Sequence, residues 1–178
     1  MQHIMLDLET MGFESNSAIV SIGVVAFDPE NDLLGETFYI NVDLTSCLDY
    51  GLSVSGETII WWLKQSSGAR ESLFENPLPL KDALVMFGEF VQKFENPKIW
   101  GNGIGFDNEI MKNAYKAVGL ERPWGYRDDR DLRTLIDIGK SIAGNQPSEI
   151  VGTKHNSLDD AISQAKIVCQ YWKALCKK

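Results

Sequence analysis

The spacing of apolar residues changes several times along the chain, between the pattern typical of strands and that typical of helices. Three β-rich stretches separated by short turns predict an antiparallel meander at His3–Glu9, Ala18–Phe27 and Glu36–Val42. A further short strand is expected at Lys98–Trp100. Helical spacing predicts helices that start at Ser55 or Thr58 and run through Leu63, and at Leu80–Phe94, Asp107–Val118, Asp131–Ile142 and Leu158–Trp172. This order of elements predicts an α/β fold with a mixed sheet.

Length and cysteine content fit one intracellular domain. The 178 residues, 44% of them hydrophobic, can bury one substantial core, so we expect a single domain over 1–178. The 3 cysteines form no CxxC pair, which predicts neither a disulfide framework nor a structural zinc site. No signal segment or membrane span is recognisable, and we expect a cytoplasmic protein with no membrane partner.

The net charge of −8 disfavours a protein that holds nucleic acid through a broad basic surface. A polyanionic substrate would need another source of attraction. Divalent cations bound by carboxylates supply one, because they present positive charge to phosphate oxygens. The acidic balance therefore disfavours general nucleic-acid binders more than it disfavours metal-dependent nucleases.

Asp7 and Glu9 are the first candidates for such a site. They are two residues apart in a predicted strand, so both side chains project from one face, while Ile4, Leu6 and Leu8 project from the other. Two neighbouring carboxylates on a buried strand need a compensating cation. Mg²⁺, an ion that prefers oxygen ligands, would provide it. The alternative is an edge strand with a solvated acidic face.

Three further polar residues lie near predicted helix starts, where structural roles are also open. Asp107 follows a glycine-rich segment and could be a helix N-cap. Asp160 could be the third residue of a helix capped by Ser157. His155 lies in the polar loop before that helix, where a base and a metal-activated water could meet, although loop histidines are often only solvated.

Together these residues carry a resemblance to a known family. The segment Asp7–Gly12 resembles the first motif, DxET, of the DEDD exonuclease superfamily. Gly105–Asp107 resembles the end of its second motif, and His155–Ala161 resembles its third, HxAxxDA. Histidine in the third motif is typical of the DEDDh branch. The resemblance implies a ribonuclease H-like fold, a mixed five-stranded sheet flanked by helices.

Two shorter segments narrow the resemblance. Thr58–Ser66 and Arg130–Thr134 are similar to segments of exonuclease A from T-even bacteriophages and, more distantly, of the ribonuclease AS and ribonuclease T group. Two positions depart from the family pattern. Gly103 stands where asparagine is usual, with Asn102 beside it, and Ser157 stands where alanine is common. The first departure concerns a substrate contact.

The resemblance implies two-metal hydrolysis of phosphodiesters from the 3′ end. Two Mg²⁺ ions, replaceable by Mn²⁺, would be held by Asp7, Glu9, Asp107 and Asp160, and His155 would act as general base. The expected products are 5′-mononucleotides.

Substrate contacts are expected around this centre. Trp61 and Trp62 are adjacent on a helix, about 100° apart, so only one can face the core squarely. An exposed tryptophan there could stack on a base, whereas in the alternative both anchor the helix. Asp131 is a candidate for orienting a metal ligand or His155 from outside the cluster. The remaining candidates for substrate binding lie beside the motifs: Thr10, Met11, Asn102 and Phe106.

The expected partner is the 3′ end of single-stranded DNA or RNA, with the similarity to the phage enzyme favouring DNA. Two other functions stay open: a catalytically silent module that binds nucleic-acid ends, and a phosphohydrolase that acts on small nucleotides. The presence of all five catalytic-type residues counts against the silent module. Related exonucleases are often dimers, so a homodimer is one possible arrangement, although no sequence feature marks an interface.

Overall fold

A computed structural model describes residues 1–146 and 150–176, and its strands form one sheet in the order β3-β2-β1-β4-β5. β1, β2 and β3 pair antiparallel, whereas β4 runs parallel to β1 and β5 parallel to β4. The expected mixed sheet of an α/β fold is confirmed. The strands are β1 His3–Thr10, β2 Ile19–Asp28, β3 Leu33–Asn41, β4 Lys98–Gly101 and β5 Asp129–Asp131.

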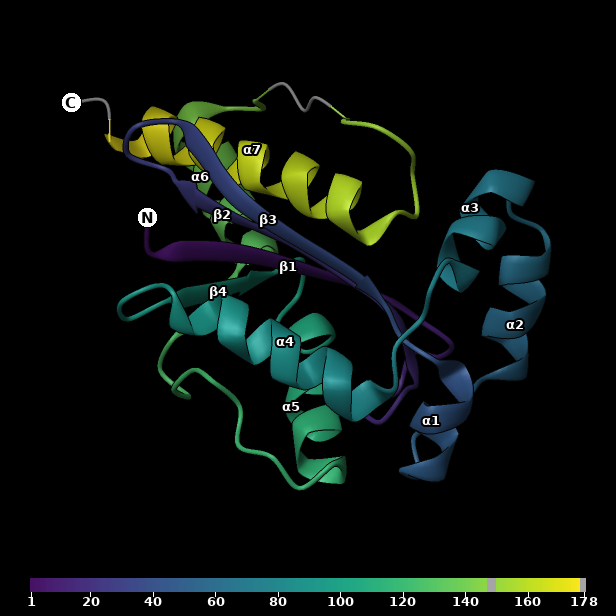
Figure 1. The fold of residues 1–178 in the computed structure, drawn as a ribbon. Coiled ribbons are helices and arrows are strands. Elements are labelled where there is room, and N and C mark those ends of the chain that lie inside the picture. The colour runs from purple at the N-terminus through teal and green to yellow at the C-terminus, as the bar shows by residue number, and fades with distance from the viewer. Residues whose placement is uncertain (147–149, 177–178) are drawn as a thin grey trace.

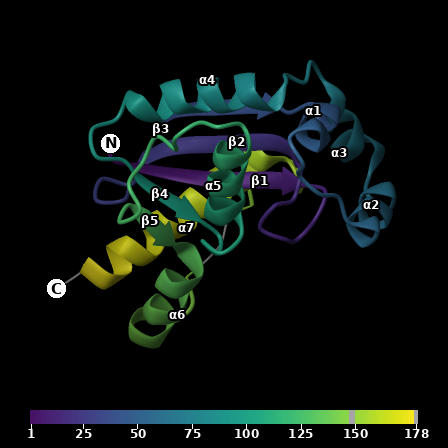
Figure 2. The same ribbon diagram turned by 90° about the horizontal axis from the view of Figure 1, so that it is seen from below.

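Helices cover both faces of the sheet. α4 and α5 pack on one face, and α7, with α6 beside it, packs on the other, while α1 to α3 gather beyond one end of the strands (Figures 1 and 2). No helix in the described ranges is both long and apolar enough to cross a membrane. The helices are α1 Leu44–Asp49, α2 Gly56–Leu63, α3 Ser67–Glu71, the 3₁₀ helix η1 Ser72–Phe74, α4 Leu80–Gln92, α5 Asp107–Ala117, α6 Leu132–Ala143 and α7 Ser157–Cys176.

The alternation of side chains along β1 divides the core into two layers. Ile4, Leu6 and Leu8 join the apolar cluster under α4 and α5. Met5 joins the cluster under α7 and α6. Residues at odd positions of β1 therefore face α7. This places Asp7 on the α7 side of the central strand.

Several boundaries differ from the sequence-based expectation. β3 begins at Leu33 rather than Glu36, because the exposed Leu33 and Leu34 pair with the end of β2 although they interrupt the polar alternation. Asp131 ends β5 and caps α6, so it is not the first helical residue. Thr58 is buried inside α2 and does not cap it, while Ser55 holds the cap position without a side-chain hydrogen bond. The elements α1, α3, η1 and β5 are too short to show a periodic pattern of apolar side chains in the sequence.

His3, at the start of β1, is a structural residue. Its ring lies 5.5 Å from Phe27, 5.9 Å from Trp100 and 5.6 Å from Trp172, measured between centroids. Trp100 donates a hydrogen bond from Nε1 to His3 Nδ1 over 2.9 Å. Burial, assisted by the positive charge of Arg130, lowers the pKa of His3 to about 4. The neutral imidazole is therefore the form that the fold accepts.

This pKa predicts a loss of stability in mild acid. A base whose pKa falls on folding contributes stability that is present above its ordinary value of 6.5 and is lost as pH falls towards the folded value. At pH 5 we expect a loss of about 1–2 kcal/mol from the half-buried His3. Urea unfolding of wild type and His3→Asn at pH 7.5 and pH 5 measures it, since other titrating groups are common to both proteins. Equal pH dependence of the two would contradict the prediction.

Candidate active site

Asp7 and Glu9 lie in the central strand β1, and their partners on β2 are small. Asp7 is opposite Gly23 and Glu9 is opposite Ser21. Glu9 is buried and Asp7 is partly buried. The predicted placement of both carboxylates on one face is therefore present in the fold.

The start of α7 lies directly against β2. A Cβ atom on Gly23 would lie 2.1 Å from the backbone carbon of Ser157, so only glycine permits this approach. The hydroxyls of Ser21 and the fully buried Ser157 share a hydrogen bond of 2.9 Å. Serine at the position where alanine is common thus joins α7 to the sheet.

The loop before α7 brings His155 and Asp160 together. Asn156 Oδ1 accepts hydrogen bonds from the backbone N–H groups of Leu158 and Asp159, so Asn156, not the expected Ser157, caps the helix. Asp160 Oδ2 accepts from the backbone N–H of His155 at 3.1 Å. His155 has φ 66°, a left-handed conformation that is uncommon outside glycine. Such local strain is often found at functional sites.

These side chains converge with Glu9. Ligand atoms of Glu9, His155 and Asp160 all lie within 4.8 Å of one another. No ion pair within 1–146 and 150–176 involves any of the four candidate carboxylates. The set of carboxylate oxygens with one imidazole suits a hard divalent cation such as Mg²⁺ or Mn²⁺.

Asp107 reaches the same strand from the other neighbour in the sheet. β4 pairs with β1 only along His3–Met5, so the later N–H groups of β1 on that side lack a strand partner. Asp107, the first residue of α5 and only 3% exposed, accepts a hydrogen bond from Leu8 N–H over 3.1 Å. It therefore points at β1 beside Asp7 and is not a simple helix cap.

Asp131 stabilises the loop that leads to Asp107. Its Oδ2 accepts from Ile104 N–H at 2.9 Å, and its Oδ1 accepts from the N–H and hydroxyl of Thr134. Gly103 in this loop has φ 107°, which a side chain would strain. In the part of the chain that the structure describes, Asp131 bonds to neither His155 nor a cluster carboxylate. Its contact is with the loop before Asp107 rather than with a ligand directly.

The crowded carboxylates are hard to ionise together. Burial, followed by the charges of Asp107 and Glu9, raises the pKa of Asp7 well above its ordinary value. Burial and the charges of Asp160 and Asp107 raise the pKa of Glu9 to about 8. Burial also raises the pKa of Asp107 and of Asp160, where the His155 N–H opposes the rise. Bound cations would reverse this penalty.

Gln164, which the sequence analysis missed, touches the cluster from α7. Its Nε2 donates to Asp7 Oδ1 at 2.6 Å. The spacing of four from Asp160 was the available signal, because it places both residues on one helix face.

The two tryptophans of α2 have different surroundings, as expected for adjacent helical residues. Trp62 is 4% exposed and donates from Nε1 to the Thr10 carbonyl at 3.0 Å. Trp61 is 39% exposed, and its ring lies edge-on to His155 with centroids 4.8 Å apart. Trp61 is therefore the one that lies exposed beside the site.

The remaining substrate-binding candidates are mostly covered. Thr10 is buried and its hydroxyl donates to the Gly12 carbonyl. Phe106 packs partly against the core, and Asn102 is half-buried. The exposed aromatic next to the first motif is Phe13, at 68%, which the sequence analysis did not select.

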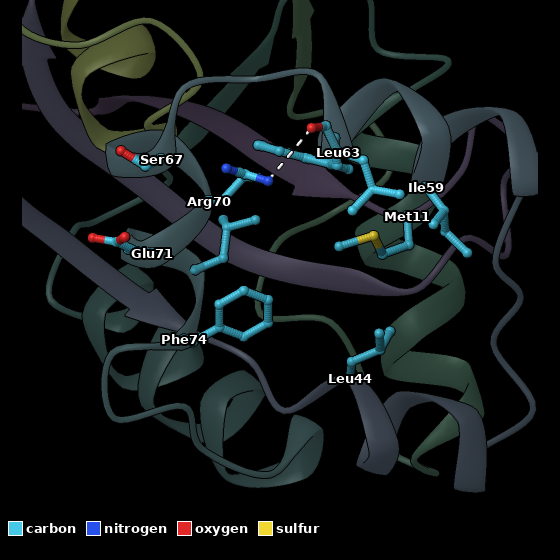
Figure 3. Close-up of a pocket in the computed structure, with 10 residues that line it drawn as sticks. Met11, Leu44, Ile59, Leu63, Ser67, Arg70, Glu71 and Phe74 are labelled. Atoms are coloured by element: carbon cyan, nitrogen blue, oxygen red, sulfur yellow. Dashed lines mark hydrogen bonds between the residues drawn. The ribbon is translucent and has the colours of Figure 1, made fainter.

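Met11 is buried and faces an apolar pocket of about 430 Å³ behind α2. Figure 3 shows Met11, Ile59 and Leu63 pointing into it, with Arg70 and Phe74 around its rim. Trp62 also lines this pocket, whereas the exposed Trp61 is not among its lining residues. None of the candidate carboxylates lines this pocket. It therefore belongs to the surroundings of α2 and not to the acidic cluster.

Comparisons with known proteins agree with this geometry. The family model described as a 3′-5′ exoribonuclease Rv2179c-like domain matches residues 2–172. An exodeoxyribonuclease of Enterobacteria phage T4 is 26% identical over 159 residues, which cover 74% of this chain and 69% of that protein.

Solved structures share the fold at low identity. The nuclease domain of 3′hExo, a DEDDh family member bound to rAMP, has a TM-score of 0.63 and 14% identity over 98% of this chain and 93% of that one. Cell-death related nuclease 4 has a TM-score of 0.68 and 14% identity. E. coli exonuclease I with a dT13 oligonucleotide has a TM-score of 0.66 and 11% identity. The match to cell-death related nuclease 4 covers 94% of this chain and 62% of that chain. The match to E. coli exonuclease I covers 92% of this chain and 39% of that chain.

The family match over nearly the whole chain agrees with the ribonuclease H-like sheet and the three motifs. The chain therefore belongs to the 3′-5′ exoribonuclease Rv2179c-like domain family.

Proposed function

We propose that the protein removes nucleotides one at a time from single-stranded 3′ ends, releasing 5′-mononucleotides by a two-metal mechanism. One observation carries the proposal. Glu9, His155 and Asp160 converge, and the raised pKa of Glu9 and Asp7 reflects a group of buried carboxylates that form no ion pair among the described residues. A site of this kind is stabilised by binding divalent ions.

Each carboxylate has a role in holding those ions. Asp7, Glu9 and Asp160 would hold one cation, and Asp7 together with Asp107 would hold the second. Two bound Mg²⁺ ions supply charge that acidifies the attacking water and stabilises the departing 3′ oxygen. Asp107, fixed by the Leu8 N–H, and Asp7, fixed by Gln164, keep their oxygens in place before substrate arrives.

His155 would accept the proton of the attacking water. Its backbone N–H is bonded to Asp160 and its ring rests against Trp61. Both contacts limit the positions of the imidazole, which a general base requires within hydrogen-bond reach of its proton. The water oxygen then forms the new P–O bond while the 3′ oxygen of the preceding nucleotide leaves.

Trp61 is proposed to stack on a base of the substrate. We expect Trp61→Ala to raise KM by about 5- to 150-fold, since stacking on an aromatic ring is worth roughly 1–3 kcal/mol per base. Steady-state kinetics on a short oligomer measure the change. Phe74→Ala, at an exposed aromatic on the rim of the pocket behind α2, serves as the control. An unchanged KM for Trp61→Ala would remove Trp61 from the substrate site.

The test of the proposed function uses matched single-stranded DNA and RNA oligomers labelled at the 3′ or 5′ end. The family description points to RNA and the phage relative to DNA, so both sugars are assayed. Stepwise shortening from the 3′ end that requires Mg²⁺ or Mn²⁺ and stops with EDTA supports the proposal. Binding of intact oligomers would instead indicate a silent end-binding module. Hydrolysis of small nucleotides alone would indicate a phosphohydrolase.

A further inference from the structure

Gln164 occupies a position where an amide is unusual for a helix packed on a sheet. It lies on α7 between the small residues Ser163 and Ala165, is 8% exposed, and contacts the cluster through Nε2 and Asp7 Oδ1 at 2.6 Å. This distance is just below the range of about 2.7–2.9 Å typical of N–H hydrogen bonds that involve a charged group. The bond links residues 157 positions apart in the chain.

The other end of the amide is unsatisfied. Gln164 Oε1 is buried and has no hydrogen-bond partner in the part of the chain that the structure describes. Turning the amide over would aim this oxygen at Asp7 Oδ1, where the ionised carboxylate, the form that holds a cation, has no hydrogen to donate. The observed orientation therefore keeps one bond to Asp7 while leaving a buried acceptor unpaired, which carries a free-energy penalty.

Attachment of α7 to the sheet does not require this bond. The helix is already joined to β2 by the Ser21–Ser157 hydrogen bond. Its apolar face also packs in the cluster that contains Ala161, Ala165 and Val168. An apolar side chain at position 164 would pack there without an orphaned oxygen.

We infer that Gln164 is a positioning residue that fixes the Asp7 carboxylate for cation binding. The terminal torsion of an aspartate is broad, so an unrestrained carboxylate samples many orientations. A donor on Oδ1 selects one of them and leaves Oδ2 and the second lone pair of Oδ1 available. Partners that orient a metal ligand typically change metal affinity about 10- to 100-fold. The inference rests on the proposed function for the identity of the bound ions.

The test compares Gln164→Met with Gln170→Met. Gln170 lies on the same helix, about 9 Å further along its axis, and its Oε1 is likewise buried without a partner. Both changes remove a buried amide oxygen without a partner, but only the first removes a hydrogen bond to Asp7. The readouts are Mn²⁺ affinity from the EPR signal of free ion, the melting temperature in EDTA, and hydrolysis as a function of metal concentration.

We expect Gln164→Met to weaken Mn²⁺ binding about 10-fold or more while its melting temperature in EDTA stays within the change caused by Gln170→Met. Hydrolysis should recover partly as the metal concentration rises. Mn²⁺ affinity equal to that of Gln170→Met would overturn the inference, and so would a fall in melting temperature with unchanged affinity. If wild type binds Mn²⁺ without hydrolysing oligomers, the proposed function fails while the affinities still decide the role of Gln164.

Discussion

Asp7→Asn is expected to reduce hydrolysis by at least about 1,000-fold while stabilising the metal-free protein. The loss follows because Asp7 is the one carboxylate proposed to contact both ions, whose charge acts in the transition state. The gain follows because asparagine removes one of several crowded charges and can still accept the hydrogen bond from Gln164. Single-turnover hydrolysis of a 5′-labelled oligomer measures the first effect.

The stability effect has a defined pH window. A carboxyl group whose pKa rises on folding contributes stability that is present below its ordinary value and is lost as pH rises through the folded value. For Glu9 this range runs from 4.5 to about 8. In EDTA, wild type should therefore lose stability between these pH values, and Asp7→Asn should lose less. Mg²⁺ should restore the melting temperature of wild type but not of the variant.

The control for Asp7→Asn is Asp137→Asn, which changes an exposed carboxylate on α6 outside the cluster. It should keep wild-type turnover and metal response. Full activity of Asp7→Asn, or a melting temperature in EDTA below that of wild type at pH 8, would contradict the account of the cluster.

His155→Asn is expected to lower kcat by about 100- to 10,000-fold, the range typical of losing a general base. Asparagine is chosen because it tolerates the positive φ of this position better than alanine does. The folded structure, and with it the Asp160 bond to the backbone N–H, should persist. Wild-type turnover of His155→Asn would assign proton transfer to another group.

Much of the fold was predictable because its long elements carry a clear period. β1 and β2 are nearly continuous runs of buried residues, and α7 carries buried residues at helical spacing. β5 was not located from the sequence, because Asp129–Asp131 are all charged and only half-buried. Their place as a strand depends on pairing with β4, a contact that leaves no periodic signal.

The candidate site was predicted to a similar extent and for related reasons. Asp7 and Glu9 follow from strand geometry alone, whereas the roles of Asp107, His155 and Asp160 came from the family resemblance. The contacts that hold the site together were invisible in the sequence. The close packing of Gly23 on Ser157 joins segments far apart in the chain and depends on how α7 lies on the sheet.

The central claim is that this cluster holds two divalent cations during hydrolysis of 3′ ends. Crystals grown with Mn²⁺ and a 5′-mononucleotide, measured at a wavelength where manganese scatters anomalously, test it most directly. The account predicts two anomalous peaks about 3.5–4 Å apart, bounded by Asp7, Glu9, Asp107 and Asp160. An anomalous map with no peak among these four carboxylates would contradict it.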